Sequence, residues 1–244
     1  MEPSMGKAAV KNSPPKAFHN LRFERKFIYL GITPEDVIQK YVLTNPFCFK
    51  EIYTRRSVNN IYFDDLNCSF YKMNVSGDGL REKYRLRWYG DQFEKVTKPI
   101  VEVKRKFGLT GDKFSYKVND LSLELTQDSP REATRKLREH LKNQQLSAKF
   151  DLLSPQLYNC YQRRYFLSDC ENYRITIDYD MRFYNPQTAS FLQSQVQLPD
   201  VVLELKYAVE LDKESRDLTQ GLKVRMSKNS KYVRGCDLVY HLHE

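Results

Sequence analysis

The sequence predicts an α+β domain in which eight antiparallel strands close into a barrel with a basic interior and helices packed outside. Runs rich in β-branched and aromatic residues recur along the chain, and short turns separate several of them. Charged and apolar residues alternate within these runs, and few helical crossovers interrupt them. The 244 residues, 41% of them hydrophobic, suffice for one large domain, which we place at 21–244 after a disordered tail at 1–20.

The expected strands share this composition and lie at 21–30, 57–65, 81–89, 99–107, 113–118, 157–167, 173–184 and 200–211. The stretches SGDG (76–79) and GLTGD (108–112) supply turns between neighbouring strands.

Helix signals occur between these strands. Thr33 can cap a helix that has Pro34 at its first position and runs to about residue 43. A second helix is expected to begin near 128–130 and to continue through REATRKLREHL. A third is expected within 211–222, and the tail that follows it is expected to be partly helical.

The charge balance favours an anionic partner. Lys and Arg number 40 against 31 Asp and Glu, a net charge of +9, which suits nucleic acid, phosphates or an acidic membrane surface. No apolar run reaches the length of a membrane span, and the N-terminus lacks a secretory signal. The five cysteines form no CxxC pair, so we expect free thiols and a cytoplasmic location.

The stretch KYRLRWYG sets Lys83, Arg85 and Arg87 on one face of a strand, with Tyr, Leu and Trp on the other. A solvated charged face explains one such strand, but the pattern recurs in LRFERKF, VEVKRK, YQRRYF and VLELKY. If the apolar sides pack against helices, the charged sides converge inward. Unpaired cations inside a barrel are costly to desolvate, and a bound polyanion such as a phosphate ligand offsets that cost.

An E-x-K pattern occurs in three strands, at Glu24/Lys26, Glu102/Lys104 and Glu204/Lys206. The two residues lie about 7 Å apart on one face, so the carboxylate can hold a divalent cation while the lysine binds phosphate. An ion pair within the sheet is the equally weighted alternative. The chain has no GxxxxGK[ST], HExxH or GxSxG motif.

Eight motifs in order resemble the VTC domain, the polyphosphate polymerase domain of vacuolar transporter chaperone complexes and their bacterial stand-alone relatives. This family belongs to the CYTH-like, triphosphate tunnel metalloenzyme superfamily. The motifs are RFERKF, NNIYFDD, KYRLRWYG, VEVKRK, CYQRRYF, RITID, LELKY and SKYV, and they span about 21–238.

The resemblance implies a tunnel in which the terminal phosphoryl group of ATP moves to a growing polyphosphate chain with the help of Mn²⁺ or Mg²⁺. It implies catalytic roles for Arg85, Arg87, Lys104, Arg163, Arg174 and Lys206. The phosphate-binding residues would be Lys26, Lys117 (or Lys113 in its place), Lys228 and Lys231. Glu204 would bind the metal, and the E-x-K pattern adds Glu24.

Two alternatives share the expected fold. One is a tunnel-type triphosphatase, although the first strand reads Arg22-x-Glu24-x-Lys26 where the superfamily often has E-x-E-x-K. The other is a non-catalytic module that binds polyphosphate or inositol phosphate. Nucleic acid is not the expected partner, because no RRM or helix-turn-helix pattern is present. The expected partners are ATP, polyphosphate and a separate membrane protein, since relatives often act beside membrane proteins.

Overall fold

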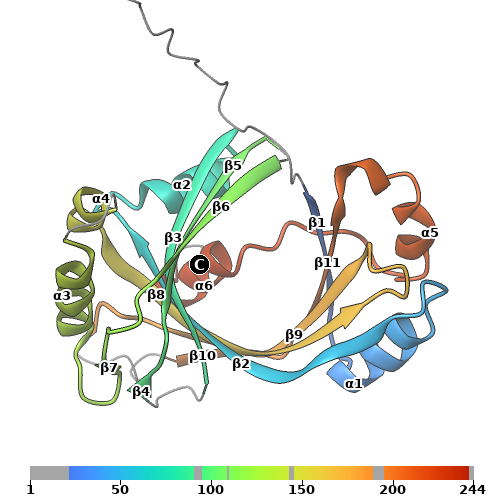
Figure 1. Cartoon of the computed structure of the whole chain (residues 1–244), viewed down its shortest axis with the longest axis horizontal. Helices are drawn as coiled ribbons and strands as arrows, with labels where there is room; N and C mark the ends of the chain where they lie inside the picture. The colour runs from blue at the N-terminus through green and yellow to red at the C-terminus, as the bar shows by residue number, and fades with distance from the viewer. Residues whose placement is uncertain (1–21, 91–94, 109, 143–145, 189–194, 242–244) are drawn as a thin grey trace, which may run out of the picture.

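A large curved antiparallel sheet dominates the computed structural model, which describes residues 22–90, 95–108, 110–142, 146–188 and 195–241 (Figure 1). The predicted tail at 1–20 lies outside these residues. The hydrogen-bonded order is β1-β11-β9-β8-β2-β3-β5-β6, with β10 paired to β9. The strands are β1 (Arg22–Tyr29), β2 (Lys50–Asp64), β3 (Leu80–Tyr89), β5 (Ile100–Phe107), β6 (Thr110–Lys117), β8 (Ser154–Leu167), β9 (Arg174–Tyr184), β10 (Gln195–Leu198) and β11 (Val201–Ala208). A small second sheet pairs β4 (Lys95–Val96) with β7 (Leu123–Glu124).

The predicted closed barrel is wrong. Strands β1 and β6 end the hydrogen-bonded path, and no backbone pairing joins them within the described residues. The sheet instead curves into an open trough (Figure 1). The free edge of β1 is occupied by a later segment, since the Ser227 N–H donates to the Lys26 carbonyl at 2.9 Å and Phe27 bridges to Met226. Alternation of side chains assigns the faces of a strand, but it does not determine whether the two outer edges meet.

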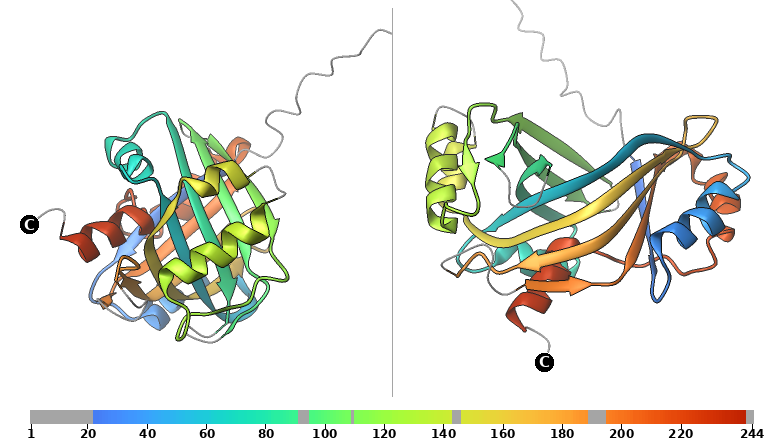
Figure 2. Two further views of the ribbon diagram at one scale, coloured as in Figure 1. Left: turned by 90° about the vertical axis from the view of Figure 1, so that its left-hand side faces the viewer. Right: turned by 90° about the horizontal axis from the view of Figure 1, so that it is seen from below.

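Helices α3 (Pro130–Leu141) and α4 (Ser147–Asp151) cover the convex face of the sheet at one end (Figure 2). Helix α3 begins as the sequence predicts, because the Ser129 hydroxyl accepts the Glu132 N–H at 3.2 Å. Its buried residues pack into one core with the apolar faces of β3 and β5, including Tyr84 and Trp88. The outward direction of the apolar side of KYRLRWYG is therefore confirmed.

A second core lies under α1 (Pro34–Val37), the π-helical turn η1 (Ile38–Leu43) and α5 (Ser215–Gln220). Thr33 caps α1 as expected, accepting the Asp36 N–H at 3.1 Å. The short 3-10 turn η2 (Val209–Leu211) links β11 to this part of the chain. These helices pack on the outer faces of β1, β9 and β11, so the opposite faces of these three strands point into the trough.

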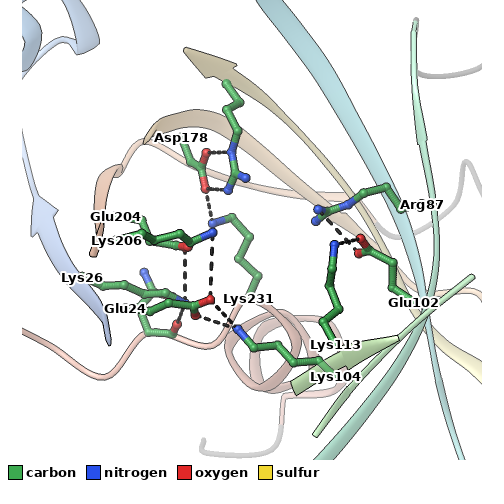
Figure 3. A network of polar contacts seen from close by, with 12 residues as sticks. Glu24, Lys26, Arg87, Glu102, Lys104, Lys113, Asp178, Glu204, Lys206 and Lys231 are labelled. Atoms are coloured by element: carbon green, nitrogen blue, oxygen red, sulfur yellow. Dashed lines mark hydrogen bonds and ion pairs between the residues drawn. The ribbon is translucent and has the colours of Figure 1, made fainter. Parts of the chain in front are cut away.

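Helix α6 (Lys231–Tyr240) packs on the concave face, so the prediction that the helices lie outside is wrong for this helix. The third core joins α6 to residues of β2, β8, β9 and β11. Gly235 permits the close approach, because a Cβ at this position would overlap Leu157 and Phe183. The Ser230 hydroxyl accepts the Val233 N–H at 3.3 Å and begins the helix. This placement brings Lys231 to the middle of the trough (Figure 3).

The described part of the chain contains no helix that is both long and apolar enough to cross a bilayer. All five cysteines are free thiols, as expected.

Candidate phosphate-binding site

Nine basic and four acidic side chains gather on the concave face, and we call them the concave cluster. Figure 3 labels ten of them. The members of the cluster are Glu24, Lys26, Lys83, Arg85, Arg87, Glu102, Lys104, Lys113, Arg163, Asp178, Glu204, Lys206 and Lys231. They come from seven strands of the sheet, β1, β3, β5, β6, β8, β9 and β11, and from α6. The basic side chains outnumber the carboxylates by five, so the face retains capacity for an anion.

Glu102 of β5 organises one half of the cluster. The Arg85 guanidinium donates from Nε to Glu102 Oε2 at 2.7 Å, and Lys113 Nζ donates to Oε1 at 2.8 Å. Arg87 Nη1 lies 3.6 Å from the same carboxylate, while its Nε donates to Asn60 at 2.8 Å. Burial opposes ionisation of Glu102, but Arg85 and Arg87 outweigh it and lower the pKa of this carboxyl. The two arginines are thus held side by side by one charged carboxylate.

Glu24 and Glu204 organise the other half. Lys104 Nζ donates to both oxygens of Glu24, at 2.7 and 2.6 Å, across the open side of the sheet. Lys206 Nζ lies 2.7 Å from Glu204 and 3.9 Å from Glu24, which brings the two carboxylates to a common cation. Burial raises the pKa of Glu204, but Lys206 and Lys26 outweigh it and hold this pKa well below its usual value. Both carboxylates therefore remain charged near neutral pH, since Lys104 and Lys206 also lower the pKa of Glu24 against its burial.

Asp178 of β9 links Arg163 to α6. Arg163 donates to both oxygens of Asp178, at 2.5 and 2.7 Å, and Lys231 Nζ donates to Oδ2 at 2.5 Å. The side chain of Asp178 is fully buried, and each basic partner is only 10% exposed. Burial opposes the charged form, yet the two cations lower the pKa of Asp178 from 3.8 to about 2.

Lys83 is a member of the cluster to which the family resemblance gave no role. Its Nζ donates to the Ser230 hydroxyl at 2.8 Å, and no carboxylate lies within 4 Å of it in the described ranges. Burial, followed by the neighbouring Lys26 and Lys104, lowers the pKa of Lys83 well below its usual value. The alternation in KYRLRWYG already placed Lys83 on the same face as Arg85. That pattern was the sequence feature from which its place in the cluster could have been predicted.

Three predicted site residues take no part in the ion pairs of the cluster. Arg174, Lys117 and Lys228 are exposed, and none forms an ion pair with another described residue. Arg174 does lie opposite Lys206 in the pairing of β9 with β11. At β6 the structure brings the alternative residue, Lys113, to Glu102. The remaining predicted site residues all belong to the concave cluster, while their roles stay predictions.

The donor set fits a hard divalent cation at Glu24 and Glu204. Mg²⁺ and similar ions commonly use one or two protein carboxylates and take further ligands from phosphate and water. Thr176 lies opposite Glu204 in the sheet, and its buried hydroxyl has no hydrogen-bond partner among the described residues. No group of three or more Asp, Glu, His or Cys suited to a metal occurs in those ranges, so phosphate would have to complete the shell.

Asp64 does not contribute to a metal site. Its carboxylate accepts the N–H groups of Phe70 and Tyr71, at 3.0 and 2.8 Å, and the Tyr232 hydroxyl at 2.6 Å. It thereby holds the start of α2 (Ser69–Ser76) against α6.

Acid should weaken the fold through Asp178. Its pKa is lower in the folded protein than in the unfolded chain, so its contribution is complete above about pH 5 and is lost as the pH falls towards 2. The difference between 3.8 and about 2 corresponds to about 2 kcal/mol. Urea unfolding at pH 5 and at pH 2.5 measures this loss. The Asp178→Asn variant should show a decline smaller by about this amount, and an equal decline in both proteins would contradict the assignment.

The fold and the site together define a class: an α+β domain whose curved antiparallel sheet presents a basic, carboxylate-containing face suited to condensed phosphates. A model of the VTC domain family matches residues 31–240, and the chain belongs to this family. The family resemblance is thereby confirmed, and membership indicates a function related to polyphosphate.

Solved structures that are similar to this chain include the PH1819 protein from Pyrococcus horikoshii OT3, at 14% sequence identity and a TM-score of 0.48. That similarity covers 87% of this chain and 97% of the other. A search of curated proteins gives no match.

Proposed function

We propose that the protein is a metal-dependent polyphosphate polymerase that transfers the terminal phosphoryl group of ATP to a growing polyphosphate chain and releases ADP. The observation that carries this proposal is the excess of basic side chains on one concave face, beside two charged carboxylates that share Lys206. Phosphoryl transfer depends mainly on positioning and on electrostatic stabilisation, and these groups supply both.

Arg85 and Arg87 would bind the phosphate oxygens of ATP. Each guanidinium can present two N–H groups to one phosphate, which fixes its orientation as well as its position. Both arginines contact Glu102. A bound phosphate would therefore replace Glu102 as the partner of some of their N–H groups. Asn60 would continue to orient Arg87.

Lys104, Lys206, Arg163 and Lys231 would neutralise the charge that spreads over the transferring group. Mn²⁺ or Mg²⁺ held by Glu204 and Glu24 would supply further neutralisation of the phosphate oxygens. An oxygen of the terminal phosphate of the chain would form the new bond to the γ-phosphorus. The bond from that phosphorus to the β–γ bridging oxygen would break, and ADP would carry the electron pair away. The attacking oxygen is already ionised, so no side chain has to remove a proton.

Incubation of the purified protein with ATP and Mn²⁺ tests this proposal. The expected products are ADP and polyphosphate chains that lengthen with time, resolved by gel electrophoresis and by ³¹P NMR. The Arg85→Ala variant should make roughly 100-fold less polymer, whereas Arg135→Ala, which removes an exposed arginine on α3, should match the unaltered protein.

Two outcomes would support the alternatives instead. Release of orthophosphate without chains would identify a triphosphatase. Tight binding of tripolyphosphate without turnover, unchanged by substitution of Glu204, would identify a non-catalytic binding module.

A further inference from the structure

Arg56 and three tyrosines form a second group on the concave face, which we call the tyrosine platform: Tyr53, Arg56, Tyr89 and Tyr165. The Arg56 guanidinium carbon lies 4.5 Å from the ring centre of Tyr53, 5.5 Å from that of Tyr165 and 5.7 Å from that of Tyr89. Tyr53 and Tyr165 meet edge to face with ring centres 5.6 Å apart. These are ordinary cation–π and aromatic distances, so the four side chains form one surface.

The pairing of the strands places the platform directly beside the concave cluster. Arg56 of β2 lies opposite Arg163 of β8, and Tyr53 lies opposite Tyr165. Tyr89 follows Arg87 by two residues, so both point to the same face of β3. Arg163 also lies 6.0 Å from the ring centre of Tyr165, and thus contacts both groups.

An irregularity in β2 is needed to build this surface. Tyr53 and Arg56 are three residues apart, so strict alternation would put them on opposite faces. The register of β2 against β8 shifts between these two residues, as in a β-bulge, and brings both to the concave face. Bulges of this kind commonly re-aim side chains next to functional sites.

Packing of the core does not account for the platform. Tyr53 is 50% exposed and Tyr89 is 40% exposed. No carboxylate lies within 4 Å of Arg56 among the residues that the structure describes, so its N–H groups have no acidic partner there. The buried hydroxyl of Tyr165 has no hydrogen-bond partner in the same ranges. Thr176, opposite Tyr165 and only 8% exposed, also has an unpartnered hydroxyl and lies next to Glu204 in the sheet.

We propose that the tyrosine platform binds the nucleoside part of a nucleotide whose phosphates lie on the concave cluster. This inference rests on the proposed function, in which ATP is the phosphoryl donor. The base stacks on the exposed rings of Tyr53 and Tyr89, and Arg56 contacts the phosphate nearest the ribose. Since stacking uses the π face that all bases share, ATP and GTP are expected to bind with similar affinity.

A comparison of two ligands tests the inference without any turnover. Calorimetry in the absence of metal gives the dissociation constants of ATP and of tripolyphosphate, which carries the phosphates but no base. The double variant Tyr53→Ala/Tyr89→Ala should weaken ATP binding by about tenfold or more, with tripolyphosphate binding changed less than twofold. Arg85→Ala, in contrast, should weaken both ligands.

Phe114→Ala is the matched control. It removes a partly exposed ring that contacts Arg105 at 4.3 Å in the same sheet, but Phe114 lies opposite Val103, whose side chain points into the core on the convex side. This variant should change neither affinity. If the double alanine variant does not fold, Tyr53→Leu with Tyr89→Leu provides the same comparison, because leucine keeps an apolar side chain at both exposed positions but removes the aromatic ring.

Equal weakening of both ligands, or unchanged ATP binding, would overturn the inference. Failure of polymer synthesis would not, because selective loss of ATP binding would still identify a nucleotide site. Conversely, a polymerase with unaltered ATP binding in the double variant would retain the proposed function and refute the platform.

Discussion

Replacement of Glu204 with glutamine is expected to reduce phosphoryl transfer roughly 100-fold or more, while metal-free binding of tripolyphosphate stays equal or becomes tighter. Glu204 is the buried carboxylate nearest to Lys206, at 2.7 Å, and it also lies 3.8 Å from Lys26. Glutamine keeps the shape of the side chain but removes the charge that a divalent cation needs. The same change frees two lysines from an internal anion, which favours an incoming phosphate.

This opposite effect on binding and on turnover separates a metal-binding role from a structural one. Isothermal calorimetry without metal measures the affinity, and the rate of ADP release with Mn²⁺ measures the turnover. Glu51→Gln is the control, because Glu51 is an acidic residue of the same sheet that pairs with Arg164 at 2.6 Å outside the concave cluster. A parallel loss of binding and turnover in Glu204→Gln would contradict the assignment, as would full activity.

Removal of the carboxylate of Asp178 should have the largest effect on stability. In the Asp178→Ala variant, Arg163 and Lys231 lose their common anionic partner in a buried position. Loss of one partner from a buried ion pair costs about 3–5 kcal/mol, since the remaining charge is left without compensation. Urea unfolding at pH 7 should show a decrease of this size.

Tripolyphosphate should restore part of this lost stability. A ligand that binds only the folded protein stabilises it in proportion to the logarithm of its concentration relative to the dissociation constant. Uncompensated Arg163 and Lys231 offer this ligand stronger contacts, so the melting temperature should rise more in Asp178→Ala than in the unaltered protein. Asp212→Ala, which breaks the more exposed pair with Arg25, should show neither the large loss nor the added rescue. Equal ligand-induced increases in Asp178→Ala and in the unaltered protein would contradict this account.

The strand positions and their faces could be predicted from the sequence because each long strand carries its own alternation. The segment from Lys83 to Trp88 shows why: a pleated strand must put successive side chains on opposite sides, whatever its neighbours are. The concave face therefore collects the residues that the alternation selected. Lys104 and Glu24 meet there although 80 positions separate them.

Other features depend on tertiary contacts that no local pattern encodes. The trough stays open because the segment at Met226 and Ser227 pairs with the edge of β1. Helix α6 lies inside the curve because Gly235 lets it approach β8 and β9. Helix α2 was not predicted. Its first N–H groups are bound by Asp64, which lies several residues earlier at the end of β2, so no capping residue next to the helix marks its start. The choice between Lys113 and Lys117 depends on which one reaches Glu102 across the sheet.

The carboxylates of the concave cluster have a consequence for which anions can enter. Most lysines and arginines there already hold an internal counter-ion, such as Glu102 for Arg85 and Asp178 for Arg163. An incoming anion must therefore compete with these carboxylates for the basic side chains. A single chloride or acetate ion gains too little binding energy to displace them. A molecule that carries several linked negative charges can displace several carboxylates in one binding event. The concave cluster is therefore expected to select ligands of high charge density.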